Sequence, residues 1–171
     1  LKHGEEGVID HVMLTENNEG NKLIQVRIRD SRIPQIGDKF TSRHGQKGVI
    51  SLVVEEADMP FSEKGIKPDI IFSPFGVPSR MTVSHLLELI GGKVGALGGR
   101  TSNGTAFEGE KEADLRKQLA EFGFKDDSTE EMYDGISGRK YNARIFVGNT
   151  YYLKLKHMVA NKLHSRARGP I

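Results

Sequence analysis

Several kinds of residue and segment are missing from this sequence of 171 residues. It contains no cysteine, which excludes disulfides, cysteine-ligated zinc and a thiol nucleophile within the chain. No run of about 18 apolar residues occurs, so a transmembrane helix is not expected. The N-terminal residues lack the basic and apolar segments of a secretory signal. These absences fit an intracellular, cytoplasmic protein.

The common catalytic motifs are missing as well. No G-x-x-x-x-G-K-[ST] loop, H-E-x-x-H segment or D-x-D pair is present, and no Ser/His/Asp arrangement stands out. The acidic residues occur as scattered or adjacent groups without metal-ligand spacing. A self-contained catalyst is therefore not expected, and no metal is predicted to be bound by this chain alone.

What is present is a folded composition with an uneven charge distribution. Hydrophobic residues make up 36% and charged residues 28%, which is typical of a globular domain. The formal net charge is +2, yet the last 37 residues carry eight Lys or Arg and no Asp or Glu. Such a one-signed tail indicates either a phosphate-binding surface or a solvated basic face.

Hydrophobic periodicity predicts a mixed α/β fold in which strands form the framework. Residues 7–14 and 22–30 alternate apolar and polar positions around a polar turn, which predicts a β-hairpin. Residues 48–54 form an apolar run without alternation, which is typical of a strand buried on both sides. A short strand is expected at Asp69–Phe72, and one or two more within residues 143–159.

Two helices are predicted between these strands. Thr82 is a plausible N-cap for a helix starting at Val83, with the glycine pair at 91–92 as its stop. A second helix fits Glu110–Phe122, with Gly123 at its C-terminal end. Residues 161–167 fit a short helical turn.

The densest group of cations lies in residues 37–48, GDKFTSRHGQKG. Lysine supplies a point charge to phosphate oxygens, and glycine lets backbone N–H groups approach an anion closely. The same pattern also fits a basic turn whose glycines only satisfy a tight bend. The cationic and ring-nitrogen side chains of this loop are Lys39, Arg43, His44 and Lys47.

Two further positions carry positive charge or a ring nitrogen. Arg80 precedes the predicted helix start, where it is either a phosphate contact or part of a structural ion pair. His157 would share an apolar strand face with Leu153 and Leu155, opposite Lys154 and Lys156. From that pattern alone, a histidine satisfied within the core is the simpler interpretation.

Several blocks of the sequence, in order across residues 4–171, match one family. The blocks are GDKFTSRHGQKGVIS, DMPF, GIKPDIIFSPFGVPSRMT, HLLELIGGK, GTAFEG, MYDG and YYLKLKHMV followed by KLHSRARGP. Together they resemble the second-largest, β-type subunit of multisubunit DNA-directed RNA polymerase, with details such as Gln46 typical of archaeal or eukaryotic members. An archaeal source is expected. Phe75 departs from the histidine common in such members, although bacterial members also carry an apolar residue there.

The resemblance implies a fold and a set of site residues. Residues 1–171 would form a fragment of the hybrid-binding domain, including part of a double-psi β-barrel. Its parts would be the basic loop 37–48, a helical portion at 82–123 and the basic, strand-rich tail 135–171. Lys39 and Lys47 match active-centre lysines near the RNA 3′ end and the incoming nucleotide, and Arg80 matches an arginine that contacts nucleotide phosphates. His157 matches a histidine near the initiating nucleotide, and the secondary nucleic-acid contacts would be Arg43, Gln46, Lys162, Arg166 and Arg168.

The resemblance also implies partners. The largest subunit would hold the catalytic Mg²⁺ with its aspartates, and the RNA–DNA hybrid, the NTP and the small assembly subunits would be the other partners. No membrane is involved, and a eukaryotic source would make the protein nuclear. The chain is then expected to be an excised fragment that is inactive alone. Two alternatives stay open: a non-catalytic nucleic-acid-binding domain, or a purely architectural segment of the assembly.

Overall fold

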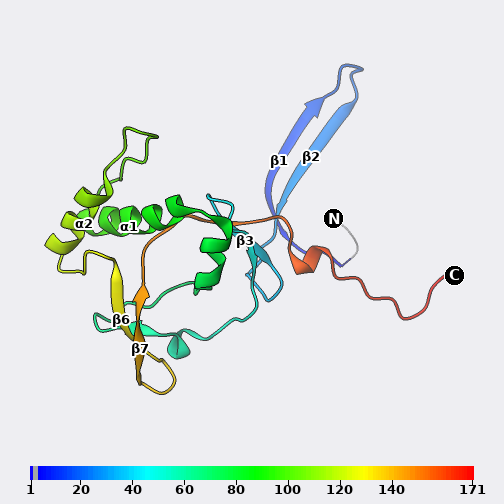
Figure 1. Cartoon of the computed structure of the whole chain (residues 1–171). Helices are drawn as coiled ribbons and strands as arrows, with labels where there is room; N and C mark the ends of the chain where they lie inside the picture. The colour runs from blue at the N-terminus through cyan, green and yellow to red at the C-terminus, as the bar shows by residue number, and fades with distance from the viewer. Residues whose placement is uncertain (2–3) are drawn as a thin grey trace. The chain divides into compact units, whose positions relative to one another are not determined.

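The computed structural model describes residue 1 and residues 4–171 and divides the chain into two units. The first unit is Leu1–Pro34 and the second is Gln35–Ile171. Both units are drawn in Figure 1. No helix among the described residues is long and apolar enough to cross a membrane.

The first unit is the predicted β-hairpin. Strands β1 (Val8–Glu16) and β2 (Lys22–Arg29) pair antiparallel, and the register shifts between Ile9 and His11. The Asn17 side chain holds the turn, because its Oδ1 accepts hydrogen bonds from two backbone N–H groups of the turn. The blue ribbon in Figure 1 shows two strands without a covering layer within this unit, and nearly all of its side chains are exposed. A two-stranded hairpin of this kind has little stability of its own.

The second unit contains two separate three-stranded antiparallel sheets. The first has the order β4-β3-β8, from β3 (Lys39–Ser42), β4 (Gly48–Val49) and β8 (Tyr152–Lys154). The second has the order β5-β6-β7, from β5 (Phe61–Ser62), β6 (Thr129–Tyr133) and β7 (Lys140–Phe146). Neither sheet closes into a barrel within the described residues. The observed class is therefore mixed α/β with several antiparallel sheets.

Two α-helices supply the small apolar core. Helix α1 (Val83–Gly98) packs against α2 (Glu112–Glu121), side by side in the green part of Figure 1. The core is formed by Ile90 and Val94 of α1 with Leu115 and Leu119 of α2. This confirms that both predicted helices form.

Short 3₁₀ turns complete the secondary structure of the second unit. Two of them, η2 and η3, lead directly into α1 and carry the chain past Arg80 to the helix start. The bounds are η1 (Glu56–Asp58), η2 (Pro74–Gly76), η3 (Pro78–Arg80) and η4 (Val159–Asn161).

The glycine pair at 91–92 does not end the first helix, contrary to the prediction. Helix α1 continues to Gly98, and Gly99 follows it in the left-handed region with φ +63°. A Cβ on Gly92 would lie 2.2 Å from the carbonyl oxygen of Asn149. The missing side chain therefore serves the close approach of the 147–150 segment to α1, a role set by the tertiary fold.

Three other predicted elements differ from the structure. Of the predicted strand 48–54, only Gly48–Val49 forms a strand, with backbone hydrogen bonds continuing at Ile50, and Leu52 and Val53 are 71% and 60% exposed. An apolar run without alternation therefore marks exposed surface here. Residues 69–72 are irregular, and the helical turn expected at 161–167 lies earlier, at Val159–Asn161.

A buried ion pair connects α1 to the second sheet. Lys93 of α1 donates to Glu130 of β6, and both side chains are almost fully inaccessible to solvent. The Lys93 Nζ also lies 4.5 Å from the ring centroid of Phe124, which packs against the helix core. Breaking such a pair by removing one partner leaves an uncompensated buried charge, so it fixes the position of α1 on the sheet.

Candidate nucleotide and nucleic-acid interface

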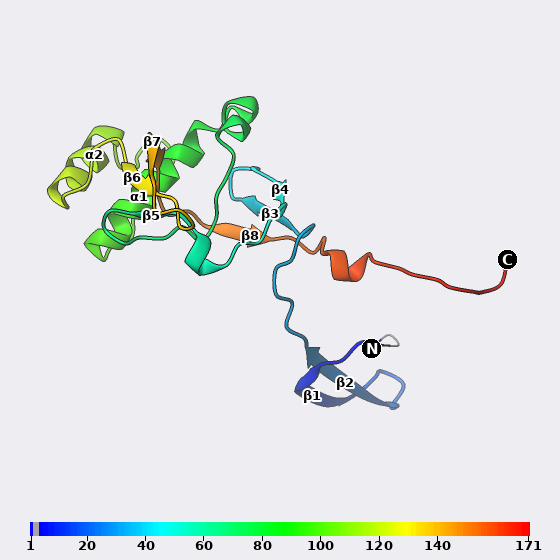
Figure 2. The same cartoon turned by 90° about the horizontal axis from the view of Figure 1, so that it is seen from below.

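Strand β8 brings the C-terminal segment back to the basic loop. Phe40 and Thr41 of β3 pair with Lys154 and Leu153 of β8, and Figure 2 shows the orange strand beside β3. The pairing continues at the main-chain level beyond β8. The Lys39 backbone N–H donates to the carbonyl oxygen of His157 at 3.3 Å, and the Lys39 carbonyl accepts from Leu155 at 3.0 Å. The predicted residues Lys39 and His157 therefore lie on adjacent chain segments.

Asp38 anchors this return of the chain. Its carboxylate is buried, with the side chain of Lys154 4.0 Å away. One oxygen accepts a hydrogen bond from the backbone N–H of Val159 at 3.0 Å, and the other accepts from Gln35 at 3.3 Å. A buried carboxylate without partners would be costly, so these contacts hold Asp38 and the 157–159 segment together.

The prediction that His157 belongs to an apolar strand face is wrong. Strand β8 ends at Lys154, and the His157 side chain is exposed. Beyond Lys154 the backbone still bonds to Lys39 through Leu155 and His157, but regular strand pairing has ended and Val159 bonds to Asp38, so the predicted alternation of buried and exposed side chains does not extend to position 157. This removes the interpretation as a satisfied core histidine and leaves a ring accessible to a ligand.

Arg80 is held by the basic loop. Its Nη1 donates to the Gln46 side-chain oxygen at 2.8 Å, and its Nη2 donates to the Lys47 carbonyl at 2.8 Å. Gln46 is fully buried, and its amide nitrogen donates to Thr82 Oγ1. Among the described residues, no carboxylate lies within ion-pair distance of Arg80, so the structural ion pair considered for it is not formed. The two acceptors are neutral oxygens, which orient the guanidinium without cancelling its charge.

Thr82 takes the N-cap position of α1, as predicted, but its hydroxyl makes no capping hydrogen bond. It instead accepts from Gln46, so the loop and the helix start share one small polar network. The network reaches β8, because Arg80 lies close enough to Tyr152 to affect its ionisation. Burial raises the pKa of the Tyr152 hydroxyl, and the Arg80 charge partly opposes that rise.

Arg43 differs from Arg80 because a carboxylate partners it. Its Nη2 donates to Glu88 of α1 at 2.5 Å, and its guanidinium lies 5.3 Å from the centroid of the Tyr151 ring. The Tyr151 backbone N–H donates to the same Glu88 oxygen at 3.2 Å. Burial alone would raise the pKa of Glu88, but hydrogen bonds from Arg43, the Tyr151 backbone and His44 bring it below its usual value. The positive charge of Arg43 is thus largely compensated by Glu88 within the fold.

The remaining predicted residues are exposed and loosely held. Lys47 projects its side chain to solvent, while its backbone carbonyl is held by Arg80. Lys162, Arg166 and Arg168 lie exposed in the irregular tail, and Arg166 donates to Pro170, four residues further along. The structure therefore brings Lys39, Gln46, Lys47 and Arg80 together with the 152–157 segment, but it does not fix the tail cations beside them.

Sequence analysis did not single out Asp38, Glu88 or Thr82 as parts of this site. Asp38 directly precedes Lys39, and Glu88 is the one acidic residue in the apolar stretch Leu86–Ile90. A carboxylate at such a position, where burial is otherwise expected, is the signal that would have found Glu88.

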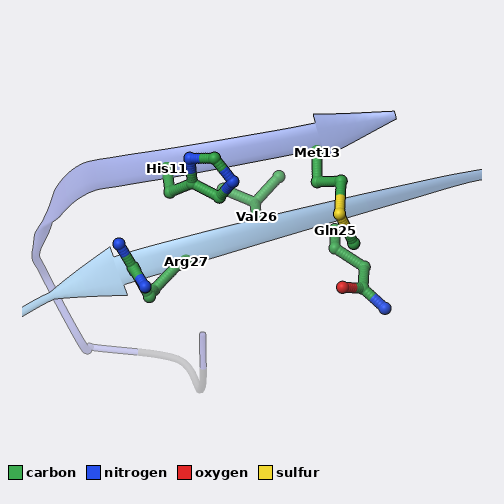
Figure 3. Close-up of a pocket in the computed structure, with 5 residues that line it drawn as sticks. All are labelled: His11, Met13, Gln25, Val26 and Arg27. Atoms are coloured by element: carbon green, nitrogen blue, oxygen red, sulfur yellow. The ribbon is translucent and has the colours of Figure 1, made fainter. Parts of the chain in front are cut away.

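The hairpin unit has a surface depression of its own, lined by His11, Met13, Gln25, Val26 and Arg27. Figure 3 shows these side chains along β1 and β2, where Arg27 also pairs with Asp10 at 2.7 Å. The depression is open and contains no convergent set of polar groups, so it does not rival the loop as a candidate site.

Comparisons with known proteins agree on one family. The model of the family described as RNA polymerase Rpb2, domain 6 matches residues 1–171. The chain is 52% identical over 171 residues to DNA-directed RNA polymerase subunit Rpo2 of Sulfolobus acidocaldarius, covering 99% of this chain and 15% of the relative. It is 51% identical to DNA-directed RNA polymerase II subunit RPB2 of Schizosaccharomyces pombe, covering 100% of this chain and 14% of the relative.

A third relative, DNA-directed RNA polymerase III subunit RPC2 of Drosophila melanogaster, is 52% identical over 169 residues, with 99% and 15% of the two chains covered. The chain thus spans about one seventh of the length of these relatives. Archaeal and eukaryotic relatives are equally similar, so the archaeal source stays a prediction. The full-length match confirms the resemblance: the chain belongs to the RNA polymerase Rpb2 domain 6 family, which occurs in second-largest subunits of DNA-directed RNA polymerases.

Proposed function

We propose that this chain supplies cationic residues to the active centre and the RNA–DNA hybrid-binding surface of a DNA-directed RNA polymerase. The observation that carries the proposal is Arg80, held at its two terminal nitrogens by Gln46 and the Lys47 carbonyl with no carboxylate partner among the described residues. A cation oriented by neutral oxygens retains its charge for a phosphate group. The Lys47 side chain is exposed, and its backbone carbonyl is one of the two acceptors that hold Arg80.

The proposed mechanism follows from that arrangement. Nucleotidyl transfer builds negative charge on the leaving pyrophosphate, and cations placed in advance stabilise that charge without reorganising during the reaction. Arg80 and Lys47 would contact the triphosphate, whereas Lys39 and His157, on adjacent segments, would face the RNA 3′ end and the initiating nucleotide. Arg43, Lys162, Arg166 and Arg168 would contact the hybrid backbone, which carries no sequence information. Gln46 acts on the nucleotide through Arg80.

The catalytic Mg²⁺ is assigned to the largest subunit. Mg²⁺ takes oxygen ligands in octahedral geometry, usually carboxylates and water. In the described part of the chain, the one group of donors close enough to share an ion contains two histidines and one glutamate, which does not suit Mg²⁺. The chain is therefore proposed to be inactive alone. Its partners would be the largest subunit, the small assembly subunits, the hybrid and the NTP.

The two open sheets fit this role in a larger subunit. We propose that residues 1–171 form one piece of the hybrid-binding domain and that the sheet β4-β3-β8 contributes to a double-psi β-barrel completed by other chain segments. Support comes from the exposed apolar side chains that follow β4, including Leu52 and Val53, which would be covered there.

The test is single-nucleotide addition by a reconstituted polymerase that carries Lys47→Ala in this segment. We expect the addition rate at saturating template to fall at least about tenfold, since the negative charge that builds up in the transition state loses one cation. Lys117→Ala is the matched control, because Lys117 is an exposed lysine of α2 in the same unit. A Lys47→Ala rate within about twofold of the unmodified enzyme would refute the phosphate role and leave the architectural alternative.

The second candidate function is nucleic-acid binding without a catalytic contribution, and the exposed basic tail favours it. It predicts that the chain alone binds an RNA–DNA hybrid with an affinity that falls steeply with salt. It also predicts that Lys47→Ala changes affinity but not the addition rate, which separates it from the main proposal.

A further inference from the structure

A compact group of potential metal ligands lies between the basic loop and α1. It consists of His44 from the loop and His85 and Glu88 from α1, and their donor atoms all lie within 4.8 Å of one another. His85 and Glu88 are three residues apart, which places them on the same face of the helix. His44 comes from the turn after β3, so the group joins two elements that are 41 residues or more apart in sequence.

The buried imidazole of His85 gives the independent reason to expect a ligand here. The side chain is only 5% exposed, and its Nδ1 is inaccessible to solvent with no hydrogen-bond partner among the described residues. Phe72 packs edge-on to the same ring, at 6.4 Å between centroids. A buried polar atom without a partner is rare and is explained by a missing water, ion or functional contact.

The other two ligands are oriented by contacts on their far sides. His44 contacts Glu88 with its Nε2, while its Nδ1 lies 3.1 Å from Ser84 Oγ. An Nδ1–H that donates to this hydroxyl leaves the Nε2 lone pair free for a metal. The Glu88 oxygen that faces His44 is Oε2, whereas Oε1 is occupied by Arg43 and the Tyr151 backbone. Metal-binding histidines and carboxylates are oriented by such outer contacts in known sites.

From this arrangement we infer that His44, His85 and Glu88 form a binding site for a divalent transition metal, with Zn²⁺ as the best match. Two imidazoles and one carboxylate are a recurrent three-ligand set for zinc, with water in the fourth position. Bonds of about 2 Å put tetrahedral ligands roughly 3.3 Å apart, so the site is completed by side-chain rotations that separate His44 Nε2 from Glu88 Oε2, which are in direct contact, and that bring His85 closer to both. The ion ties the basic loop to α1 through residues other than those of the Arg80–Gln46 contact. This inference does not depend on the proposed function.

Zinc is favoured over the alternatives for chemical reasons. Mg²⁺ and Ca²⁺ prefer oxygen ligands, and this group offers two nitrogens. A purely hydrogen-bonded cluster would satisfy His44 and Glu88 but leave His85 Nδ1 without a partner. The positive charge of Arg43 beside Glu88 opposes a second cation, so the affinity is expected to be micromolar and not tighter.

The test is Zn²⁺ titration of the whole 171-residue chain by isothermal calorimetry in a non-chelating buffer. We expect one saturable site, weakened at least about tenfold in His85→Asn and in His44→Asn. His11→Asn and His164→Asn are the matched controls, because both histidines lie outside the group, and these variants should change the affinity by less than about twofold. Circular dichroism without metal verifies that each variant is folded.

A second measurement on the unmodified chain covers the case in which a variant does not fold. Nitrogen chemical shifts of the histidine rings, followed by NMR during the Zn²⁺ titration, should change for His44 and His85 before those of His11 and His157. The absence of saturable binding tighter than about 100 µM, or equal affinity in folded His85→Asn, would overturn the inference. Ring-nitrogen changes that begin at His11 or His157 would overturn it as well.

Discussion

The loop at residues 43–47 and the tail at residues 160–171 are both rich in cations, yet the fold treats them differently. In the loop, Gln46 is fully buried, and the side chains of Arg43 and His44 contact Glu88 on α1. In the tail, every side chain is exposed. Oriented charges can act on one transition state, whereas exposed charges without fixed partners raise the local concentration of a polyanion. Under the proposed function, the same residue types would therefore serve two physical purposes.

The largest effect is expected from Arg80→Ala. The loss of a preorganised cation should lower the single-nucleotide addition rate about 100-fold. Arg80→Lys should recover only part of the rate, because an ammonium group cannot contact the Gln46 and Lys47 oxygens in the fork geometry of guanidinium. Arg139→Ala, which removes an exposed arginine of the β6–β7 turn, is the control. If Arg80→Lys behaves like the unmodified enzyme, orientation is unimportant and the contrast between loop and tail fails.

A smaller effect is expected from Gln46→Leu, which keeps the side-chain size but removes the amide. Arg80 and Thr82 lose a partner, so the stability should fall by about 1–3 kcal/mol. We also expect the addition rate to fall roughly tenfold through misplacement of Arg80. Rates of the double variant with Arg80→Ala check the mechanism. A double variant much slower than Arg80→Ala alone would show that Gln46 acts independently of Arg80.

The tail should give a weaker and different response. Arg166→Ala combined with Arg168→Ala should lower hybrid affinity several-fold and reduce the magnitude of the salt slope by about 2, one for each lost phosphate contact. The addition rate at saturating template should stay within about twofold, since these side chains are not oriented toward one position. Filter binding over a salt series and the addition assay measure the two quantities. A rate loss comparable to that of Lys47→Ala would place the tail at the chemistry.

The smallest effect concerns a third segment, the loop that joins α1 to α2. Arg100 holds Glu110 with two hydrogen bonds of 2.8 and 2.7 Å and lowers the pKa of that carboxyl to about 2. Because the folded-state pKa lies below the unfolded value, this contact stabilises the loop above about pH 4.5 and is lost as the pH falls toward 2.

Hydrogen exchange, corrected for intrinsic rates, measures this loss at the Asn103 amide, which donates to Glu110 at 2.8 Å. Protection should decline over that pH range, while Arg166 and Arg168 amides stay unprotected throughout. Constant protection of Asn103 down to pH 2 would show that the Glu110 charge does not hold the loop.

The sequence pattern correctly predicted the secondary-structure elements that depend mainly on residues close together in the sequence. The alternation at 7–14 and 22–30 corresponds to the observed hairpin, and the helices predicted from Val83 and within Glu110–Phe122 are both present. The prediction of a buried strand at residues 48–54 was wrong for most of the run. Hydrophobicity indicates that a surface is to be covered, but not whether the covering residues belong to the same chain. The role of Gly92 depends on Asn149, which approaches it only in the folded unit.

The candidate site was predicted in part for a similar reason. The motif blocks identified Lys39, Lys47, Arg80 and Gln46, and the structure brings the latter three together through hydrogen bonds. The partners that orient Arg43 and the 157–159 segment, Glu88 and Asp38, come from distant positions. Sequence spacing has no information on such contacts, which arise only when the chain returns at β8.

The hydrogen bond from the Val159 backbone to Asp38 joins residues that are 121 positions apart, so it can form only after the ribosome has made the chain between them. At about 5–20 residues per second, a ribosome needs roughly 6–24 s to make the chain between the two partners. During that interval β3 lacks its β8 neighbour and has an unpaired edge, which favours aggregation. Pairing between such distant segments is also slow because of the loop that must close. The basic loop would thus be among the last parts of the chain to fold. A chaperone or early assembly would protect the β3 edge most effectively in the interval before β8 pairs with it.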